Sequence, residues 1–161
     1  MAYTRKRTAK RTRPKDRTCY ETAVYLLQFR DQSEKDLTRK LKEREYTEKE
    51  IEEAMERLRD YEYVNDKDLA DELFEAYRRR AQYGDAYIHQ KLKLKGLATE
   101  KHLQLEEEIE MAAALLQKKW GMSPKLRTDF KKSASFLLRR GFSHDAVMTV
   151  MHEMDLEETE E

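Results

Sequence analysis

The chain has few of the residues that build turns and crosslinks. Its 161 residues include four glycines and two prolines, so the turn-rich all-β sandwiches and barrels are disfavoured. The one cysteine, Cys19, excludes a disulfide framework and any cysteine-based zinc site within one chain. No run of about 18 apolar residues occurs, and no apolar stretch follows the N-terminal charges, so neither a membrane span nor a secretory signal is expected. These absences predict a cytoplasmic protein in a reducing compartment, with no membrane partner.

Charged residues make up 41% of the chain and apolar residues 39%, which predicts a highly solvated protein with a thin core. The overall net charge is zero, but residues 1–18 carry +7 and residues 153–161 carry −6. A basic arm usually contacts nucleic acid or another polyanion, and an acidic tail usually stays solvated. We therefore expect a basic flexible arm at 1–18, a folded domain at 19–154 and an acidic tail at 155–161. The alternative, that both ends are disordered solubilising tails, stays open.

Apolar residues recur at the spacing of one helix face. The first such stripe consists of Ile51, Ala54, Met55 and Leu58. It follows Thr47 and Glu50, which have the spacing of a capping box. Three further stripes follow helix-start signals at Asn65–Asp66, Ser123–Pro124 and Ser143. By this interpretation three glycines come directly after helices, namely Gly96, Gly121 and Gly141. The sequence is consistent with an all-α fold.

An internal repeat underlies the order of these helices. The run Leu37-x3-Leu41-x3-Glu45-Tyr46 is echoed by Ile88-x3-Leu92-x3-Gly96-Leu97 and by Leu137-x3-Gly141-Phe142. We expect three repeats, at about 19–66, 67–106 and 107–154, that stack into an elongated, curved array of about nine short helices. Because residues 99–120 contain neither glycine nor proline, one junction is expected to be a continuous long helix. A coiled coil is disfavoured because the stripes break about every 10 to 15 residues.

These runs also carry a resemblance to a known family. The run Ser33-Glu34-x2-Leu37-x3-Leu41, the run Tyr63-Val64-Asn65-Asp66 and the closing run from Phe136 to Ser143 resemble the RecX family. The resemblance covers about residues 19–154. It implies an array of three-helix repeats and a bacterial regulatory protein that binds the filament of the RecA recombinase on single-stranded DNA and restrains its activity.

The sequence departs from the family pattern at several corners. Glu45 and Glu62 stand where glycine is usual. A left-handed helix end costs a residue other than glycine about 1 kcal/mol, so we expect these two corners to close differently. Asp85 follows Gly84 where the family commonly continues with proline and arginines, so basic contacts there are not carried over. Ser133 replaces a usual apolar residue, which predicts a thinner core in the third repeat.

Motifs of catalysis and metal binding are absent from the sequence. No phosphate loop of the form G-x4-G-K-[ST] occurs, and Cys19 has no nearby histidine. The four histidines, His89, His102, His144 and His152, are scattered, so surface or capping roles are favoured over metal binding. Residues 106–108 are three consecutive glutamates, which we interpret as a solvated face, and Trp120 as a core or corner residue. No catalytic residue, metal site or cofactor is expected, and the protein is not expected to be an enzyme.

Clusters of cations are the remaining candidates for a binding site. The candidate partner-binding residues at helix ends are Arg78, Arg79, Arg80, Lys91, Lys95, Arg139 and Arg140. The candidate nucleic-acid contacts in the arm are Arg5, Lys6, Arg7, Lys10, Arg11 and Arg13. Cations in a last helical turn also suit the helix dipole, which is the plainer explanation. Five tyrosines, Tyr61, Tyr63, Tyr77, Tyr83 and Tyr87, could stack on bases, but their spacing favours packing between repeats.

Three functions follow from these observations. The resemblance favours a monomeric, non-enzymatic inhibitor of the RecA filament that acts in recombination, DNA repair and the SOS response. A helical DNA-binding protein that uses the arm and the cationic turns is the first alternative, and its binding of naked DNA should fall steeply with salt. A generic helical adaptor, which binds neither partner, is the second.

Overall fold

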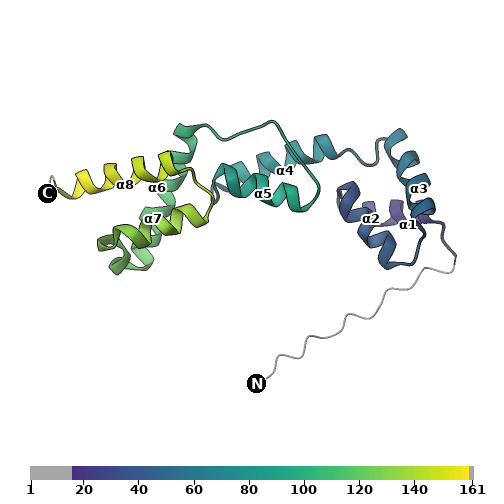
Figure 1. The fold of residues 1–161 in the computed structure, drawn as a ribbon, viewed down its shortest axis with the longest axis horizontal. Coiled ribbons are helices and arrows are strands. Elements are labelled where there is room, and N and C mark those ends of the chain that lie inside the picture. Colours follow the sequence, from purple (N-terminus) through teal and green to yellow (C-terminus); the bar gives the residue numbers. More distant parts are fainter. Residues whose placement is uncertain (1–15, 160–161) are drawn as a thin grey trace, which may run out of the picture. The chain divides into compact units, whose positions relative to one another are not determined.

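The computed structural model describes residues 16–159, with side chains described as far as Met154. Within this range it contains eight α-helices, one 3₁₀ helix and no strand (Figure 1), which confirms the all-α fold class. The helices are α1 (Cys19–Leu27), α2 (Glu34–Glu43), α3 (Glu48–Asp60), α4 (Asp66–Arg80), α5 (Asp85–Leu94), α6 (Leu105–Met122), the 3₁₀ helix η1 (Pro124–Thr128), α7 (Phe130–Arg139) and α8 (His144–Thr159). None of the described helices is both long and apolar enough to cross a membrane.

The chain divides into two units, and the boundary follows Leu69 in the first turn of α4. In the first unit α1 packs on α2 and α3 around the apolar stripes of these helices. Leu37, Leu41 and Leu58 are fully buried there. Tyr46, which follows α2, places its hydroxyl 2.6 Å from the Thr22 hydroxyl and donates to the carbonyl of Arg17 at 3.0 Å. Arg17 is therefore tied to the folded unit although it lies in the predicted arm.

In the second unit α6 packs on α7, α8 and η1. Its core includes the fully buried Leu116, Leu137 and Val150. Ser133 is also fully buried. Its hydroxyl accepts the indole N–H of Trp120 at 3.0 Å and donates to the Leu126 carbonyl at 2.8 Å. The polar residue predicted to thin this core is thus satisfied by hydrogen bonds, and Trp120 packs against the same core.

Several predicted helix starts are confirmed. Thr47 and Glu50 form a reciprocal capping box at the start of α3, with N···O distances of 3.2 and 2.9 Å. Asn65 caps α4 by accepting the backbone N–H of Asp68, and Ser143 caps α8 by accepting that of Ala146. A side-chain acceptor satisfies one of the backbone N–H groups that the first helical turn leaves without a partner, which is why these residue types begin helices.

Three predicted helix boundaries are wrong. Ser123 and Pro124 open the short 3₁₀ helix η1, and α7 begins later, at Phe130, behind the cap Asp129. The expected continuous helix over residues 99–120 is also wrong, because α6 begins at Leu105 and residues 95–104 are not helical. Hydrogen bonds from distant residues hold this segment: Asp71 accepts the Thr99 hydroxyl at 2.6 Å, and Asp85 accepts the Leu103 N–H at 2.7 Å. Gly121 lies in the last turn of α6 rather than after it.

The predicted difference at the two glutamate corners is wrong as well. Glu45 and Glu62 have φ angles of 66° and 57°, in the same left-handed region as Gly96 and Gly141 at 72° and 84°. The corners therefore close alike, and the two glutamates carry the strain that a Cβ atom has in this conformation.

Replacement of the strained Glu62 by glycine should stabilise the protein. We expect Glu62→Gly to raise the free energy of unfolding by about 0.5–1 kcal/mol, because glycine has no Cβ to strain at this φ. Urea denaturation followed by circular dichroism measures the change. As the control, Glu53→Gly on the exposed face of α3 should destabilise by about 1 kcal/mol, the ordinary cost of glycine inside a helix. Equal destabilisation by both variants would contradict the argument.

Candidate functional site

Three tyrosines of the second unit form one aromatic cluster. Tyr83 and Tyr87 stack with ring centroids 3.8 Å apart and planes 7° from parallel. Tyr77 on α4 packs edge-on against both, at 6.4 Å. All three tyrosines are half-buried, so each is partly exposed to solvent. The sequence favoured packing for these tyrosines, whereas Tyr61 and Tyr63 of the first unit stack on each other and stay exposed.

Three of the predicted cations surround this cluster, and each comes from a different element. Arg80 at the end of α4 lies 5.9 Å from the Tyr77 ring, and Lys91 on α5 lies 5.3 Å from the Tyr87 ring. Arg140, just after α7, lies 5.5 Å from the Tyr83 ring. These are cation–π distances, at which a ring face attracts a positive charge. We call the set Tyr77, Tyr83, Tyr87, Arg80, Lys91 and Arg140 the tyrosine surface.

Arg140 is the best fixed of these cations. Its guanidinium donates to the Gln82 carbonyl at 3.1 Å and lies 4.9 Å from the Phe136 ring as well as over Tyr83. Its own carbonyl accepts the N–H of Gly84 at 2.8 Å. The side chain is therefore oriented before any partner arrives, which reduces the entropy lost on binding.

Two glycines let the elements of this surface meet. A Cβ atom on Gly84 would lie 2.3 Å from the Gly141 carbonyl oxygen, and one on Gly141 would lie 2.4 Å from the Tyr87 backbone nitrogen. Both contacts involve backbone atoms, which cannot move aside cheaply. The start of α5 and the corner between α7 and α8 can therefore approach this closely only where both residues lack a side chain.

A buried carboxylate links the same two elements. Glu108 on α6 is 4% exposed, and it is the one charged side chain that is buried among the described residues. Its oxygens accept the backbone N–H of Asp85 at 2.8 Å and that of Ser143 at 3.2 Å. These donors belong to the amino ends of α5 and α8, where helix dipoles favour a negative charge. The prediction that residues 106–108 form a solvated face is therefore wrong for Glu108.

Arg78 is held by acidic side chains of its own unit. Its guanidinium forms ion pairs with Glu107 on α6 and, at 3.6 Å, with Glu75. The hydrogen bond that the Arg78 guanidinium donates to the Glu107 carboxylate raises the pKa of Arg78 above its ordinary value. The pKa of Glu107 is lowered, chiefly because its carboxylate accepts the backbone N–H of Gln104, with a further contribution from Arg78. Arg78 thus serves the fold, because its charge is paired with carboxylates of the same unit.

The other predicted site residues are spread out. Arg79 is exposed on the last turn of α4, and Arg139 is exposed and donates to the Ser135 carbonyl of its own helix at 3.3 Å. Lys95 is the half-buried C-cap of α5. The arm residues Arg5, Lys6, Arg7, Lys10, Arg11 and Arg13 lie outside the described residues. No pattern in the sequence alone distinguishes Arg140 from Arg139, because the difference lies in contacts with Gln82 and Tyr83, which are 58 and 57 positions away.

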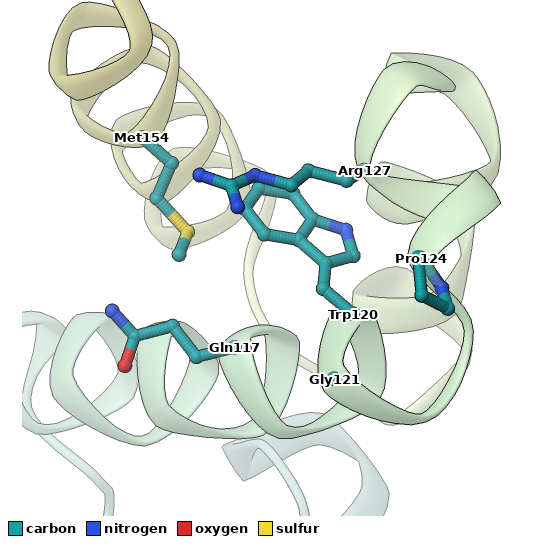
Figure 2. Close-up of a pocket in the computed structure, with 6 residues that line it drawn as sticks. All are labelled: Gln117, Trp120, Gly121, Pro124, Arg127 and Met154. Carbon is teal, nitrogen blue, oxygen red and sulfur yellow. The ribbon is translucent and has the colours of Figure 1, made fainter. Parts of the chain in front are cut away.

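A cavity lies beside Trp120. Gln117, Trp120, Gly121, Pro124, Arg127 and Met154 line a cavity of about 480 Å³ (Figure 2). The Arg127 guanidinium lies over the indole ring at 5.8 Å. Among the described residues that line it there is no pair of acid and base and no nucleophile.

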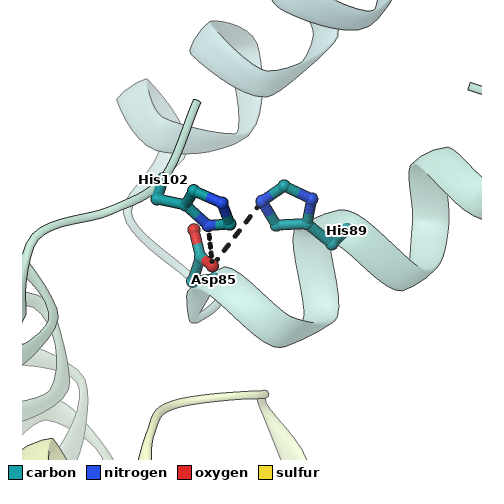
Figure 3. A group of neighbouring side chains, drawn as sticks. All are labelled: Asp85, His89 and His102. Atoms are coloured by element: carbon teal, nitrogen blue, oxygen red, sulfur yellow. Dashed lines mark hydrogen bonds and ion pairs between the residues drawn. The ribbon is translucent and has the colours of Figure 1, made fainter. Parts of the chain in front are cut away.

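Two of the scattered histidines come together with a carboxylate. His89 on α5 and His102 in the segment after it stack with ring centroids 4.5 Å apart. The Asp85 Oδ2 atom lies 2.8 Å from His102 Nδ1 and 3.5 Å from His89 Nε2 (Figure 3). Within the part of the chain that the structure describes, these three residues are the group whose donor atoms could hold a metal ion.

The described part of the chain is all-helical, and its second unit carries the cationic tyrosine surface. Comparison with known proteins identifies the class further. Residues 19–58 match the family model "RecX, first three-helix domain", and residues 106–151 match "RecX, third three-helix domain".

Known proteins are similar to this chain over the greater part of its length. "Regulatory protein RecX" of Actinobacillus pleuropneumoniae serotype 5b is 33% identical over 155 residues, covering 89% of this chain and 96% of that protein. The protein of the same name from Bacillus velezensis is 27% identical and covers 88% of this chain, which spans 57% of that longer relative. The crystal structure of RecX from Lactobacillus salivarius superposes with a TM-score of 0.74 at 25% identity, covering 86% of this chain and 95% of that one. The chain belongs to the RecX family of regulatory proteins.

The lowered pKa of Glu107 predicts a pH-dependent stability contribution. Because its pKa is lower in the folded state, the charged carboxylate stabilises the fold above its ordinary pKa of 4.5 and loses this effect as pH falls through the folded-state pKa. We expect Glu107→Gln to reduce the free energy of unfolding at neutral pH by no more than about 1 kcal/mol, since the pair is near the surface. Urea denaturation at about pH 7 and about pH 3 should show the loss only at the higher pH. The exposed neighbour Glu106 provides the control, Glu106→Gln, with no change at either pH. A loss of equal size at both pH values would contradict this origin.

Proposed function

We propose that this chain binds the RecA recombinase filament on single-stranded DNA and inhibits its activity without catalysing a reaction. The family membership supports a regulatory role, and the resemblance noted in the sequence supports RecA as the partner. One structural observation supports a binding site for it: the tyrosine surface gathers three cations from α4, α5 and the end of α7 around half-buried rings.

The chemistry of this surface suits an acidic partner. The guanidinium groups of Arg80 and Arg140 can each grip a carboxylate or phosphate through two hydrogen bonds, and Lys91 adds a compact charge. The tyrosines offer rigid amphipathic contact area that loses little entropy on binding. A filament of protein on DNA presents both carboxylates and phosphates, so electrostatic attraction would guide the encounter and the rings would supply contact.

Direct binding of single-stranded DNA is a second candidate. The parallel stack of Tyr83 and Tyr87, flanked by Lys91 and Arg140, has the composition of a platform on which bases stack. The two candidates differ in their salt dependence. Binding through phosphates weakens steeply as salt rises, because each neutralised phosphate releases a counterion. Inhibition of RecA well below the concentration that coats the DNA favours the filament as the target.

Neighbouring arginines give a matched test of the site. We expect Arg140→Gln to weaken inhibition of RecA ATP hydrolysis on single-stranded DNA several-fold, because it removes the oriented guanidinium. Arg139→Gln should leave inhibition unchanged, since Arg139 bonds its own helix. Arg140→Lys should restore the charge without restoring full inhibition.

A second variant separates binding from stability. Arg140 also bonds Gln82, so Lys91→Gln tests the surface at a cation whose contact is with the Tyr87 ring. It should weaken inhibition while the melting temperature stays within about 2 °C, as expected for a surface change. Parent-like inhibition by folded Arg140→Gln and Lys91→Gln variants would remove the tyrosine surface from the binding site.

The basic arm should act through charge. Deletion of residues 1–15 leaves Arg17 and the Thr18 cap of α1 in place, so we expect an unchanged melting temperature. Loss of basic charge should weaken binding to a fluorescent single-stranded oligonucleotide or to the filament at low salt, and the difference should shrink as salt rises. Equal binding before and after the deletion would exclude the arm from the encounter.

A further inference from the structure

The cluster of Asp85, His89 and His102 has the composition of a transition-metal site. Imidazole nitrogens and carboxylate oxygens are ligands for Zn²⁺ and for its neighbours Co²⁺, Ni²⁺ and Cu²⁺. The donor atoms of Asp85, His89 and His102 all lie within 4.8 Å of one another. Three protein ligands with a fourth position left for water is a common arrangement of zinc.

The two distances from the Asp85 carboxylate to the histidines are close to those that a metal ion requires. Zinc bonds of about 2.0–2.1 Å in a tetrahedron place two ligand atoms about 3.4 Å apart. Asp85 Oδ2 and His89 Nε2 are 3.5 Å apart, which already fits. Asp85 Oδ2 and His102 Nδ1 are 2.8 Å apart, a hydrogen-bond length that would have to increase by about half an ångström. The His102 side chain is 61% exposed and can make this movement.

Hydrogen bonds outside the cluster fix the Asp85 carboxylate in place. Its other oxygen, Asp85 Oδ1, accepts the backbone N–H of Leu103 at 2.7 Å. The backbone N–H of Asp85 donates in turn to the buried Glu108. Oδ2 is thus left facing both imidazoles, and such supporting hydrogen bonds are what orient the ligands of metal sites.

Without a metal ion, each of the two imidazoles forms a hydrogen bond. His102 Nδ1 donates to Asp85, and His89 Nε2 lies 3.0 Å from the carbonyl of Lys101, to which it donates. A metal ion would replace both bonds. Each neutral ring would then carry its proton on its other nitrogen, so the exchange needs a change of tautomer and no net loss of protons.

We propose that Asp85, His89 and His102 bind a divalent transition-metal ion of the zinc class. The ion ties His102, in the non-helical segment 95–104, to two residues of α5. Metal binding therefore fixes this segment against α5 and raises the stability of the second unit. The proposal does not depend on the RecA partner, because it rests on three side chains away from the cations of the tyrosine surface.

Titration with Zn²⁺ alone tests the site. The full chain, without a histidine tag and freed of metal by a chelator, is titrated with ZnCl₂ by calorimetry, and with CoCl₂ by visible absorption. We expect one ion per chain, with cobalt bands of a four-coordinate site that Zn²⁺ abolishes. Excess Zn²⁺ should also raise the melting temperature, since a ligand that binds the folded state stabilises it.

Variants identify the ligands. His102→Gln and His89→Gln should each weaken Zn²⁺ binding at least tenfold and abolish the rise in melting temperature, while their circular dichroism stays that of the parent. The matched control is His144→Gln, an exposed histidine at the start of α8, which should bind Zn²⁺ like the parent. Parent-like affinity in His102→Gln, or an equal loss in His144→Gln, overturns the proposal. So does the absence of saturable binding in the parent.

Discussion

The buried carboxylate of Glu108 fixes the arrangement of the second unit. It accepts backbone N–H groups at the start of α5 and at the start of α8, and both donors stand at the positive ends of helix dipoles. A buried charge is costly unless such partners compensate it. Without this acceptor two backbone N–H groups would lose their bond inside the protein, at about 1–3 kcal/mol each. One side chain on α6 therefore determines where two other helices begin relative to each other.

The tyrosine surface depends on this arrangement. Once the start of α5 lies against the corner after α7, Gly84 and Gly141 meet backbone to backbone, and Tyr87 is carried to that corner. Tyr83 then stacks on Tyr87, and Arg140 reaches the carbonyl of Gln82. The same carboxylate supports the opposite side of α5, because Asp85 is bonded through its N–H to Glu108 and through its side chain to Leu103 and His102. The candidate partner surface and the candidate metal site share one support.

Local patterns in the sequence predicted local structure. The stripe ending at Leu58 and the caps Thr47, Asn65 and Ser143 depend on residues three or four positions apart, and the structure confirms them. The errors share a different cause. Residues 97–104 have a helical composition but are drawn into tertiary hydrogen bonds by Asp71 and Asp85. Glu108 sits in a run of glutamates that looks solvated, and only its distance from two remote N–H groups reveals its role.

The cations show why the candidate site was only partly predictable. The sequence offers Arg78, Arg79, Arg80, Lys91, Lys95, Arg139 and Arg140 as candidates, and it favours the pair Arg139 and Arg140 because their flanking residues match the family. Arg78 faces Glu75 and Glu107, so its charge is neutralised within the fold. Arg140 faces two aromatic rings and a carbonyl, which orient the guanidinium without cancelling its charge. An arginine paired with a carboxylate stabilises a fold, and its charge is neutralised there. An arginine that packs on aromatic rings keeps a charge that no carboxylate neutralises, so a partner's anion can still pair with it. What surrounds each cation, rather than its position along a helix, therefore separates an arginine that serves the fold from one that we propose as a partner contact.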